Sequence, residues 1–362
     1  MGVKGLWELV AAAAEHKDLT ALAVEGMRPT SGPTMLYRVG VDARYGGSHW
    51  QKGKNPELRT LVFRLSNLYT KPFAVVFVGD GPERPGNKRD INVGKKSHWL
   101  TTDMKDLVVA FGFDWIEAPA EAEAELASMS QAGLIDAVLS DDGDTLMFGA
   151  VAVIRKCVSH VLIVALDIDR PYSSSSRKED GDVVAIYRAS AIQENPAVQM
   201  TRGGMVLLAV LAGGDYHKVC YGLFKCGAKI AHGLTRYGLG DALLACVANS
   251  ADDQSFRVAL SAWRLELVYL LRVDPRGFIG QRCISLAASV PEDFPNPAVV
   301  RAYARPLTTS PDNITLDDSF GRIMKFDLAE IAALCKKHFS WDEEELRKRM
   351  RTLVWPGAVL RL

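Results

Sequence analysis

Short apolar runs alternate with helical patterns along the first 150 residues. The apolar runs, rich in β-branched residues, are 35–43, 73–79 and 136–140. Such runs are typical of strands buried inside a parallel sheet. Apolar residues recur at helical spacing in 56–70, 102–111 and 119–132, the first opened by Pro56. The order strand, helix, strand, helix, strand predicts an α/β fold with a central, mostly parallel, twisted sheet flanked by helices.

The rest of the chain changes character twice. Residues 169–182 are polar and serine-rich, which predicts an exposed loop between strands. Helical periodicity returns over 201–245 together with many glycines, and 251–362 reads as a mainly helical lobe. We therefore expect three regions, 1–100, 101–250 and 251–362.

Composition narrows the class of protein. With 362 residues, 48% of them hydrophobic and 24% charged, the chain is long enough to bury a sizeable core as a soluble globular protein. Lys and Arg total 43 and Asp and Glu total 43, so the formal net charge is zero. Any surface that binds nucleic acid must therefore be local.

The six cysteines include no C-x-x-C pair and no His/Cys cluster with metal-ligand spacing. This pattern favours reduced thiols in an intracellular compartment. No apolar run is long enough to span a bilayer.

Acidic residues stand where each predicted strand ends. Asp42 follows the first strand, Asp80 the second, and Asp141, Asp142 and Asp144 the third. The carboxyl ends of parallel strands form one edge of a sheet, where ligands bind. Taken singly, these acids have ordinary structural explanations, because Asp42 and Asp80 could cap helices and Asp144 could close a turn.

Taken together, the acids predict a metal site. Holding several carboxylates about 4–6 Å apart in a partly buried cleft costs several kcal/mol unless a cation lies among them. Oxygen ligands without histidine or cysteine favour Mg²⁺ or Mn²⁺ over zinc. Two such ions are suited to phosphodiester hydrolysis.

The helix predicted at 119–132 and the later segment "LAGGDY" add further acids. If Glu121 and Glu123 both reach the metals, they must lie in the first turn, where side chains fan around the helix end. Glu125 is then expected to be a solvated helix residue. Asp215 lies beside two glycines in the later segment.

Six blocks follow one another along the chain, namely "MGVKGLWELV" (1–10), "GVDA" (40–43), "VFVGDGPERP" (76–85), "APAEAEAELA" (118–127), "LSDDGDTLMFGA" (139–150) and "LAGGDYHKVCYGLFKCGAKIAHGL" (211–234). In this order, the blocks resemble the flap endonuclease/XPG superfamily of structure-specific 5′ nucleases. The resemblance covers nearly the whole chain and is greatest to the Holliday-junction resolvase branch. It implies a PIN-like, resolvase-like nuclease core, comprising an N-terminal nuclease region, an internal region with a helix-two-turn-helix near 211–240, and a helical C-terminal extension.

The resemblance also implies a catalytic set and its ions. The metal ligands would be Asp42, Asp80, Glu121, Glu123, Asp142, Asp144 and Asp215. Asp141 stays outside this set. Together they would hold two Mg²⁺, with Mn²⁺ able to substitute.

Two segments are expected to contact DNA. Residues 84–99 carry five cations, Arg84, Lys88, Arg89, Lys95 and Lys96, against Asp90, which gives a net charge of +4. On composition alone this segment could be an ordinary solvated loop. The resemblance makes it the short arch that grips phosphates near the scissile bond, with Lys88 and Lys95 beside the chemistry.

In the segment 213–234, Gly222 and Gly227 fit a close approach of backbone amides to a duplex, and Lys225 and Lys229 add charge. A purely structural helical hairpin is the alternative. The family resemblance implies a bound K⁺ here and places Gly2 and Lys4 near the DNA branch point.

The sequence thus predicts a Mg²⁺-dependent, structure-selective DNA endonuclease that resolves four-way junctions and cuts 5′ flaps. It would be monomeric in solution, dimeric on a junction and located in the nucleus, with roles in DNA repair and recombination. A 5′ flap endonuclease and a non-catalytic DNA-structure binding protein remain as alternatives.

Overall fold

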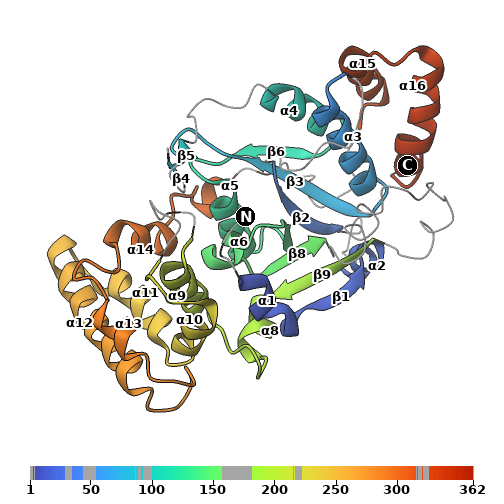
Figure 1. The fold of residues 1–362 in the computed structure, drawn as a ribbon. Helices are drawn as coiled ribbons and strands as arrows, with labels where there is room; N and C mark the ends of the chain where they lie inside the picture. Colours follow the sequence, from blue (N-terminus) through green and yellow to red (C-terminus); the bar gives the residue numbers. More distant parts are fainter. Residues whose placement is uncertain are drawn as a thin grey trace.

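The computed structural model describes most of the chain (Figure 1). The described residues are 3, 5–28, 35–43, 54–85, 100–156, 182–214, 216, 222–314, 316, 320 and 326–361, with the backbone alone at 87–88 and 91–92. The serine-rich segment 169–181 lies outside them.

One seven-stranded sheet organises the molecule, in the order β1-β9-β8-β7-β2-β3-β6. Its strands are β1 (Glu15–Asp18), β2 (Tyr37–Asp42), β3 (Phe73–Gly79), β6 (Asp114–Glu117), β7 (Ala137–Leu139), β8 (Ala152–Lys156) and β9 (Val183–Arg188). Neighbours from β8 to β6 are parallel, whereas β9 is antiparallel to both β8 and β1. The mostly parallel sheet predicted from the apolar runs is confirmed. The runs 35–43, 73–79 and 136–140 contain β2, β3 and β7, in that order.

Helices cover both faces of this sheet. Successive residues of β3 point to opposite sides, so Val76 and Val78 belong to one core and Val75 and Phe77 to another. The first face carries α1 (Leu6–Val10), the 3-10 helix η1 (Ala11–Ala13), α5 (Ala122–Gln131), α6 (Asp144–Phe148) and α8 (Ala189–Glu194). The second carries α2 (Leu19–Glu25), α3 (Pro56–Tyr69) and α4 (Thr101–Ala110).

The helix predicted over 119–132 begins three residues late, at Ala122. Residues 118–120 instead run beside the loop after β3. The Ala118 amide donates to the Gly79 carbonyl at 2.9 Å, and the Gly81 amide donates to the Ala120 carbonyl at 2.7 Å. These bonds hold the entry to α5 against the end of β3.

A helical lobe adjoins the first face through α6 and α9 (Figure 1). It comprises α9 (Arg202–Ala212), α10 (Ala228–Thr235), α11 (Leu239–Asn249), α12 (Asp253–Val273), α13 (Ile284–Ala288) and α14 (Pro297–Ala304), followed by the 3-10 helix η2 (Pro311–Asn313). The predicted helical content of this region is confirmed.

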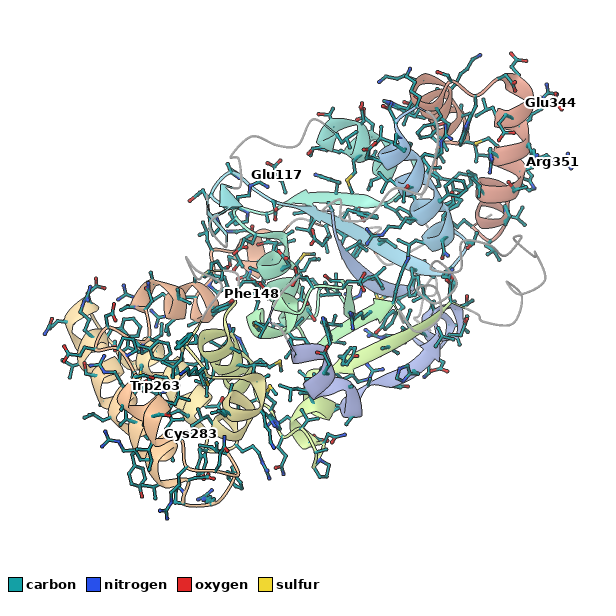
Figure 2. The ribbon with its side chains drawn as sticks, viewed as in Figure 1. Glu117, Phe148, Trp263, Cys283, Glu344 and Arg351 are labelled. Carbon is teal, nitrogen blue, oxygen red and sulfur yellow. The ribbon has the colours of Figure 1, made fainter. Side chains whose placement is uncertain are left out.

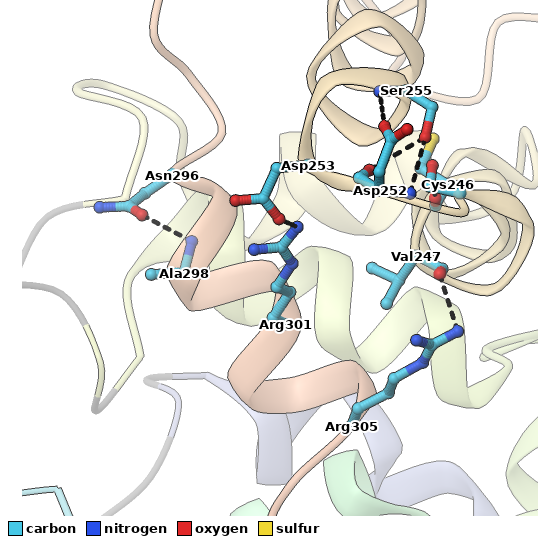
Figure 3. A network of polar contacts seen from close by, with 10 residues as sticks. Cys246, Val247, Asp252, Asp253, Ser255, Asn296, Ala298, Arg301 and Arg305 are labelled. Carbon is cyan, nitrogen blue, oxygen red and sulfur yellow. Dashed lines mark hydrogen bonds and ion pairs between the residues drawn. The ribbon is translucent and has the colours of Figure 1, made fainter.

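Polar contacts hold α14 to its neighbours in the lobe (Figure 3). A capping box between Asp252 and Ser255 starts α12. Arg301 pairs with Asp253, and Arg305 Nη2 donates to the Val247 carbonyl at 2.9 Å. These contacts tie α14 to α12 and α11.

The last helices return to the second face of the sheet. They are α15 (Leu328–Phe339), α16 (Glu343–Arg349), the π-helical turn η3 (Met350–Val354) and α17 (Trp355–Val359). The Asp327 amide donates to the Ala110 carbonyl at 3.0 Å, and Arg361 Nη2 donates to the Lys71 carbonyl at 3.1 Å. Residues 251–362 thus serve two places in the fold, and the proposed boundary near residue 250 stays a prediction.

Two further expectations concern cysteines and membranes. The described Cys226, Cys246, Cys283 and Cys335 carry free thiols. In the described part of the chain, no helix has the length and apolar character needed to cross a bilayer.

Candidate metal centre

Three adjacent strands deliver acidic residues to one edge of the sheet. Asp42 ends β2, Asp80 directly follows β3, and Asp142 and Asp144 follow β7. Because β7, β2 and β3 are neighbours and parallel, their carboxyl ends meet. The strand ends predicted from sequence therefore lie side by side.

Helix α5 brings two more carboxylates to this edge. Glu121 is its N-cap residue and Glu123 lies in its first turn, at the end where side chains fan outward. The Asp80 side chain accepts from the Ala122 amide at 2.9 Å, so the acid after β3 satisfies the first amide of α5. Asp80 therefore caps α5, whereas the structural explanation from sequence had it capping the next helix along the chain, which is α4.

The turn after β7 holds its own two acids in place. The Ser140 hydroxyl accepts from the Asp142 amide at 3.1 Å, and Asp142 Oδ1 accepts from the Asp144 amide at 3.2 Å. Thr145 Oγ1 donates to the Asp142 carbonyl at 3.0 Å. The Asp141 side chain is 68% exposed, and its Oδ1 lies 3.8 Å from Arg155 Nε.

Most of these carboxylates are buried. Exposed fractions are 8% for Asp42, 5% for Glu121, 1% for Glu123, 7% for Asp142 and 3% for Asp144. Burying several carboxylates together is costly unless cations or hydrogen bonds compensate. The burial therefore favours a bound cation over a solvated acidic face.

Two arginines offset part of the negative charge. Arg84 Nη1 lies 3.3 Å from Asp80 Oδ2. Arg64 of α3 is close enough to Asp42 and Asp141 that both carboxylates raise its pKa, against the larger lowering of that pKa by burial. The sequence analysis did not identify Arg64, because its position within an amphipathic helix carries no mark of a site.

Tyr216 was also missed, although it directly follows Asp215. Its hydroxyl donates to Glu121 Oε2. Burial, and then the neighbouring Glu121 carboxylate, raise the pKa of Tyr216, so the hydroxyl keeps its proton and remains a donor. The sequence offered one signal for Tyr216, namely its position directly after the predicted ligand Asp215.

Glu125 was predicted to be solvated, and that prediction is wrong. The residue is completely buried, and its Oε2 accepts from the Thr309 amide at 2.9 Å. The segment after α14 covers this face of α5, which local helical spacing cannot reveal. Glu125 therefore joins α5 to the chain that leaves the helical lobe.

The donor set fits a hard divalent cation, because all six described members are carboxylates, the ligands that Mg²⁺ and Mn²⁺ prefer. Among the residues that the structure describes, no three His, Cys, Asp or Glu side chains stand close enough together to hold an ion between them. The seventh predicted ligand, Asp215, lies outside that set. The seven-residue ligand set therefore stays a prediction.

The predicted basic segment is described only in part. Arg84 pairs with Asp80, and the backbones of β4 (Asn87–Lys88) and β5 (Ile91–Asn92) form a small antiparallel pair. Arg89, Lys95 and Lys96 lie outside the described residues, as do Gly2 and Lys4. Their roles remain predictions.

Helices α9 and α10 flank the segment of the predicted helix-two-turn-helix, in which residues 215 and 217–221 lie outside the described residues, so that motif stays a prediction. A Cβ at Gly222 would collide with the Leu211 carbonyl, so the turn needs glycine there. Gly227 caps α10 with open space around it, and Lys225 adopts a left-handed φ of 68°. Lys229 is exposed in the first turn of α10.

Comparison with known proteins gives consistent matches. The family model described as the XPG I-region matches residues 112–215, which include α5 and the turn after β7. The mouse protein "Flap endonuclease GEN homolog 1" is 27% identical over 284 residues, covering 72% of this chain and 28% of its own length. This chain therefore spans about a quarter of that relative.

Solved structures match almost the whole chain. A junction-resolving enzyme GEN-1 with potassium superposes with a TM-score of 0.75 at 28% identity, covering 99% of this chain and 79% of that one. The Holliday junction-resolving enzyme GEN1 with product DNA, Mg²⁺ and Mn²⁺ gives 0.74 at 29% identity, with coverages of 99% and 78%. Over almost its whole length, the chain is similar to the junction-resolving enzymes of the flap endonuclease/XPG superfamily.

Proposed function

We propose that this chain is a Mg²⁺-dependent, structure-selective DNA endonuclease that resolves four-way junctions. One observation carries the proposal, namely the convergence of buried carboxylates from three neighbouring strand ends and the start of α5. The similar GEN1 structure with product DNA and Mg²⁺ supports the same substrate class and metal.

The acids would hold two Mg²⁺ ions. The proposed ligands are Asp42, Asp80, Glu121, Glu123, Asp142, Asp144 and Asp215. When bound, such ions act as Lewis acids in the in-line hydrolysis of a phosphodiester. Around them, Tyr216 orients Glu121 through its hydroxyl, and Asp80 ties the end of β3 to α5.

The cations of this chain would position the DNA. Arg84, Lys88, Arg89, Lys95 and Lys96 would hold the phosphate next to the acids, with Lys88 and Lys95 closest to the scissile bond. Gly222, Lys225, Gly227 and Lys229 would anchor a duplex arm, and Gly2 and Lys4 would approach the branch point. We place a K⁺ ion at the hairpin, and the similar GEN-1 structure with potassium supports the ion itself.

The assembly would depend on DNA. Resolving a junction requires two incisions, so we propose a monomer in solution and two protomers on one junction. The similarity to this superfamily supports roles in DNA repair and recombination, and with them a nuclear location. Sedimentation of the free protein and of its junction complex tests the stoichiometry, and a stable dimer without DNA would contradict it.

A cleavage assay tests the function. An end-labelled four-way junction incubated with the protein and Mg²⁺ should give symmetric nicks, and EDTA should abolish them. Asp142→Asn and Asp144→Asn should each lower the cleavage rate about 10²–10³-fold, a loss of several kcal/mol of transition-state stabilisation, while junction binding persists. Full turnover in either variant would remove these residues from the mechanism.

The same assay separates the alternatives. The mouse relative's name favours a second activity, on 5′ flaps, so a flap substrate is run beside the junction. Faster cutting of the flap would favour a flap endonuclease. A non-catalytic DNA-structure binding protein would bind both substrates without any EDTA-sensitive scission.

A further inference from the structure

A groove opens between the C-terminal helices. These helices lie on the face of the sheet away from α5 and α6 (Figure 1). It has a volume of about 440 Å³. Leu328 and Ala332 of α15 line one side, and Leu346, Met350 and Trp355 line the other. The floor is therefore apolar, with α15 on one side and the run from α16 through η3 to α17 on the other.

Helical spacing shows that the groove is a built face and not a chance gap. Leu328, Ala332 and Lys336 are four residues apart, so they form one stripe along α15. On α16 and η3, Arg347 and Arg351 are likewise four apart and face the groove. Arg349 lies on the opposite side, where its guanidinium is 5.8 Å from the Phe63 ring of α3.

The rim of the groove is mostly cationic. Lys336, Arg347 and Arg351 stand around it against the single acid Glu343. Arg351 points away from the body of the molecule in Figure 2, so its charge is available to a partner. Trp355 is 54% exposed, and Val359, one turn further along α17, is also 54% exposed. The apolar surface therefore continues past the groove.

The π-helical turn η3 contributes to this shape. It covers Met350–Val354 and places Met350 and Arg351 between α16 and α17. Single π-turns within α-helices occur frequently at functional sites. Here the wider turn connects α16 to α17, whose exposed Trp355 also lines the groove.

We propose that this groove binds a short amphipathic helix of a partner protein that carries acidic residues beside its apolar face. The stripe from Leu328 to Lys336 is about 12 Å long, which matches two turns of helix. An apolar floor takes the anchors of such a helix at positions i, i+3, i+4 and i+7, and the cationic rim pairs with its acids.

Other occupants fit less well. A second copy of this chain in a two-fold interface would bring the same patch face to face, so Lys336, Arg347 and Arg351 would meet like charges. DNA would place phosphates over Leu328, Ala332 and Met350, which offer nothing polar to bind them. The apolar floor with a cationic rim selects an acidic amphipathic peptide.

Fluorescence anisotropy tests the proposal with two synthetic probes. Each is a labelled peptide of about twelve residues, three turns of helix. Both carry leucines at i, i+3, i+4 and i+7, flanked by glutamates in the first peptide and by lysines in the second. The protein should bind the glutamate peptide at least about tenfold more tightly than the lysine peptide, since several exposed ion pairs are gained or lost.

Charge reversal supplies the matched variants. The double variant Arg347→Glu with Arg351→Glu should weaken the glutamate peptide about tenfold and strengthen the lysine peptide, because the rim becomes acidic. The control Lys348→Glu changes an exposed residue of α16 that does not line the groove, and it should leave both affinities unchanged. All three positions are exposed, so thermal unfolding should be close to that of the original protein.

Three results would overturn the proposal. Equal binding of the two peptides would show that the cationic rim does not select an acidic peptide. If binding of the glutamate peptide is undetectable, or is unchanged in the double variant, the groove is not its binding site. Sedimentation showing self-association that the double variant abolishes would make a second copy the occupant.

Discussion

At the scale of single residues, Tyr216 links the acidic cluster to the helical lobe. Its hydroxyl donates to Glu121, and its ring meets Tyr303 of α14 edge-on, with 4.8 Å between centroids. Tyr303 in turn packs against Phe148 of α6, which lies on the side of the core that adjoins the lobe (Figure 2). The position of a predicted ligand therefore depends on aromatic packing from a distant part of the chain.

Replacing Tyr216 by Phe should raise the Mg²⁺ concentration needed for half-maximal cleavage about tenfold, because partners that orient metal ligands contribute 10–100-fold. The ring contact with Tyr303 is kept, so DNA affinity should not change. The measurement is cleavage rate against Mg²⁺ concentration, with Tyr303→Phe as the control. An unaltered Mg²⁺ dependence in Tyr216→Phe would assign the hydroxyl a structural role only.

Sequence reasoning placed some site residues and missed others for a physical reason. Asp42, Asp80 and Asp142 follow buried strands, and parallel strands bring such ends together by local rules alone. Tyr216 and Glu125 acquire their surroundings from segments 95 and 184 residues away in sequence. Contacts of that range are decided by tertiary packing, which no local pattern encodes.

At the scale of elements, α9 and α11 approach each other through glycine. A Cβ at Gly240 would collide with the Gly203 carbonyl, and Thr201 Oγ1 donates to Asp241 Oδ1 at 2.9 Å beside this contact. The two helices pack backbone to backbone here, which no larger residue permits.

Gly240→Ala should therefore lower the free energy of unfolding by about 2 kcal/mol, in the range for overpacked sites. Urea unfolding measures the change. Gly227→Ala is the matched control, because nothing lies within 4 Å of a Cβ there and its φ is −76°. A midpoint for Gly240→Ala equal to that of the control would mean that the helices separate without cost.

The contact of α15 with α4 should depend on pH. His338 is 5% exposed and its Nε2 lies 3.6 Å from Asp103 Oδ1. Burial lowers the pKa of His338, Lys337 and Lys54 lower it further, and Asp103 and Asp106 oppose them. The unfolded chain then takes up a proton before the folded one does, so this histidine destabilises the fold as pH falls below about 6.5.

The measurement is the urea midpoint at pH values of about 7.5 and 5.5, on either side of an unperturbed histidine pKa. The original protein should lose more stability between them than His338→Gln, because glutamine does not titrate. Other groups titrate equally in both proteins, so the difference isolates His338. Equal losses would show that folding does not lower the pKa of His338.

Element prediction was most accurate where an element is apolar throughout. The strand 73–79 was predicted with the bounds that β3 has, since its seven residues are all buried. β1 reads Glu-His-Lys-Asp and was not predicted, because an edge strand pairs through its backbone and leaves polar side chains outside. The late start of α5 reflects its pairing with the loop after β3.

At the scale of the whole molecule, equal numbers of acidic and basic residues conceal an uneven distribution. Buried acids gather at one edge of the sheet, whereas the proposed DNA contacts and the groove rim are cationic. The sequence gives the balance of charge but not its arrangement, because α15–α17 pack on α3 and α4, more than 200 residues earlier in the chain. Partners are therefore selected by local fields and not by net charge.

DNA binding should accordingly depend on salt as strongly as a basic protein's does. Arg84 pairs with Asp80 and is left out of the count of phosphate contacts. The seven other proposed cationic contacts are Lys4, Lys88, Arg89, Lys95, Lys96, Lys225 and Lys229. The slope of log K against log salt concentration should then be about −6, at roughly −0.9 for each phosphate neutralised. Replacing both Lys225 and Lys229 by Gln should bring it to about −4.5 and weaken flap and junction binding equally, because phosphate contacts carry no sequence or branch information. Lys348→Gln, on the far face of the molecule, is the control. A slope that stays at its original value in the double variant would place the duplex away from α10 and leave the hairpin as a structural element.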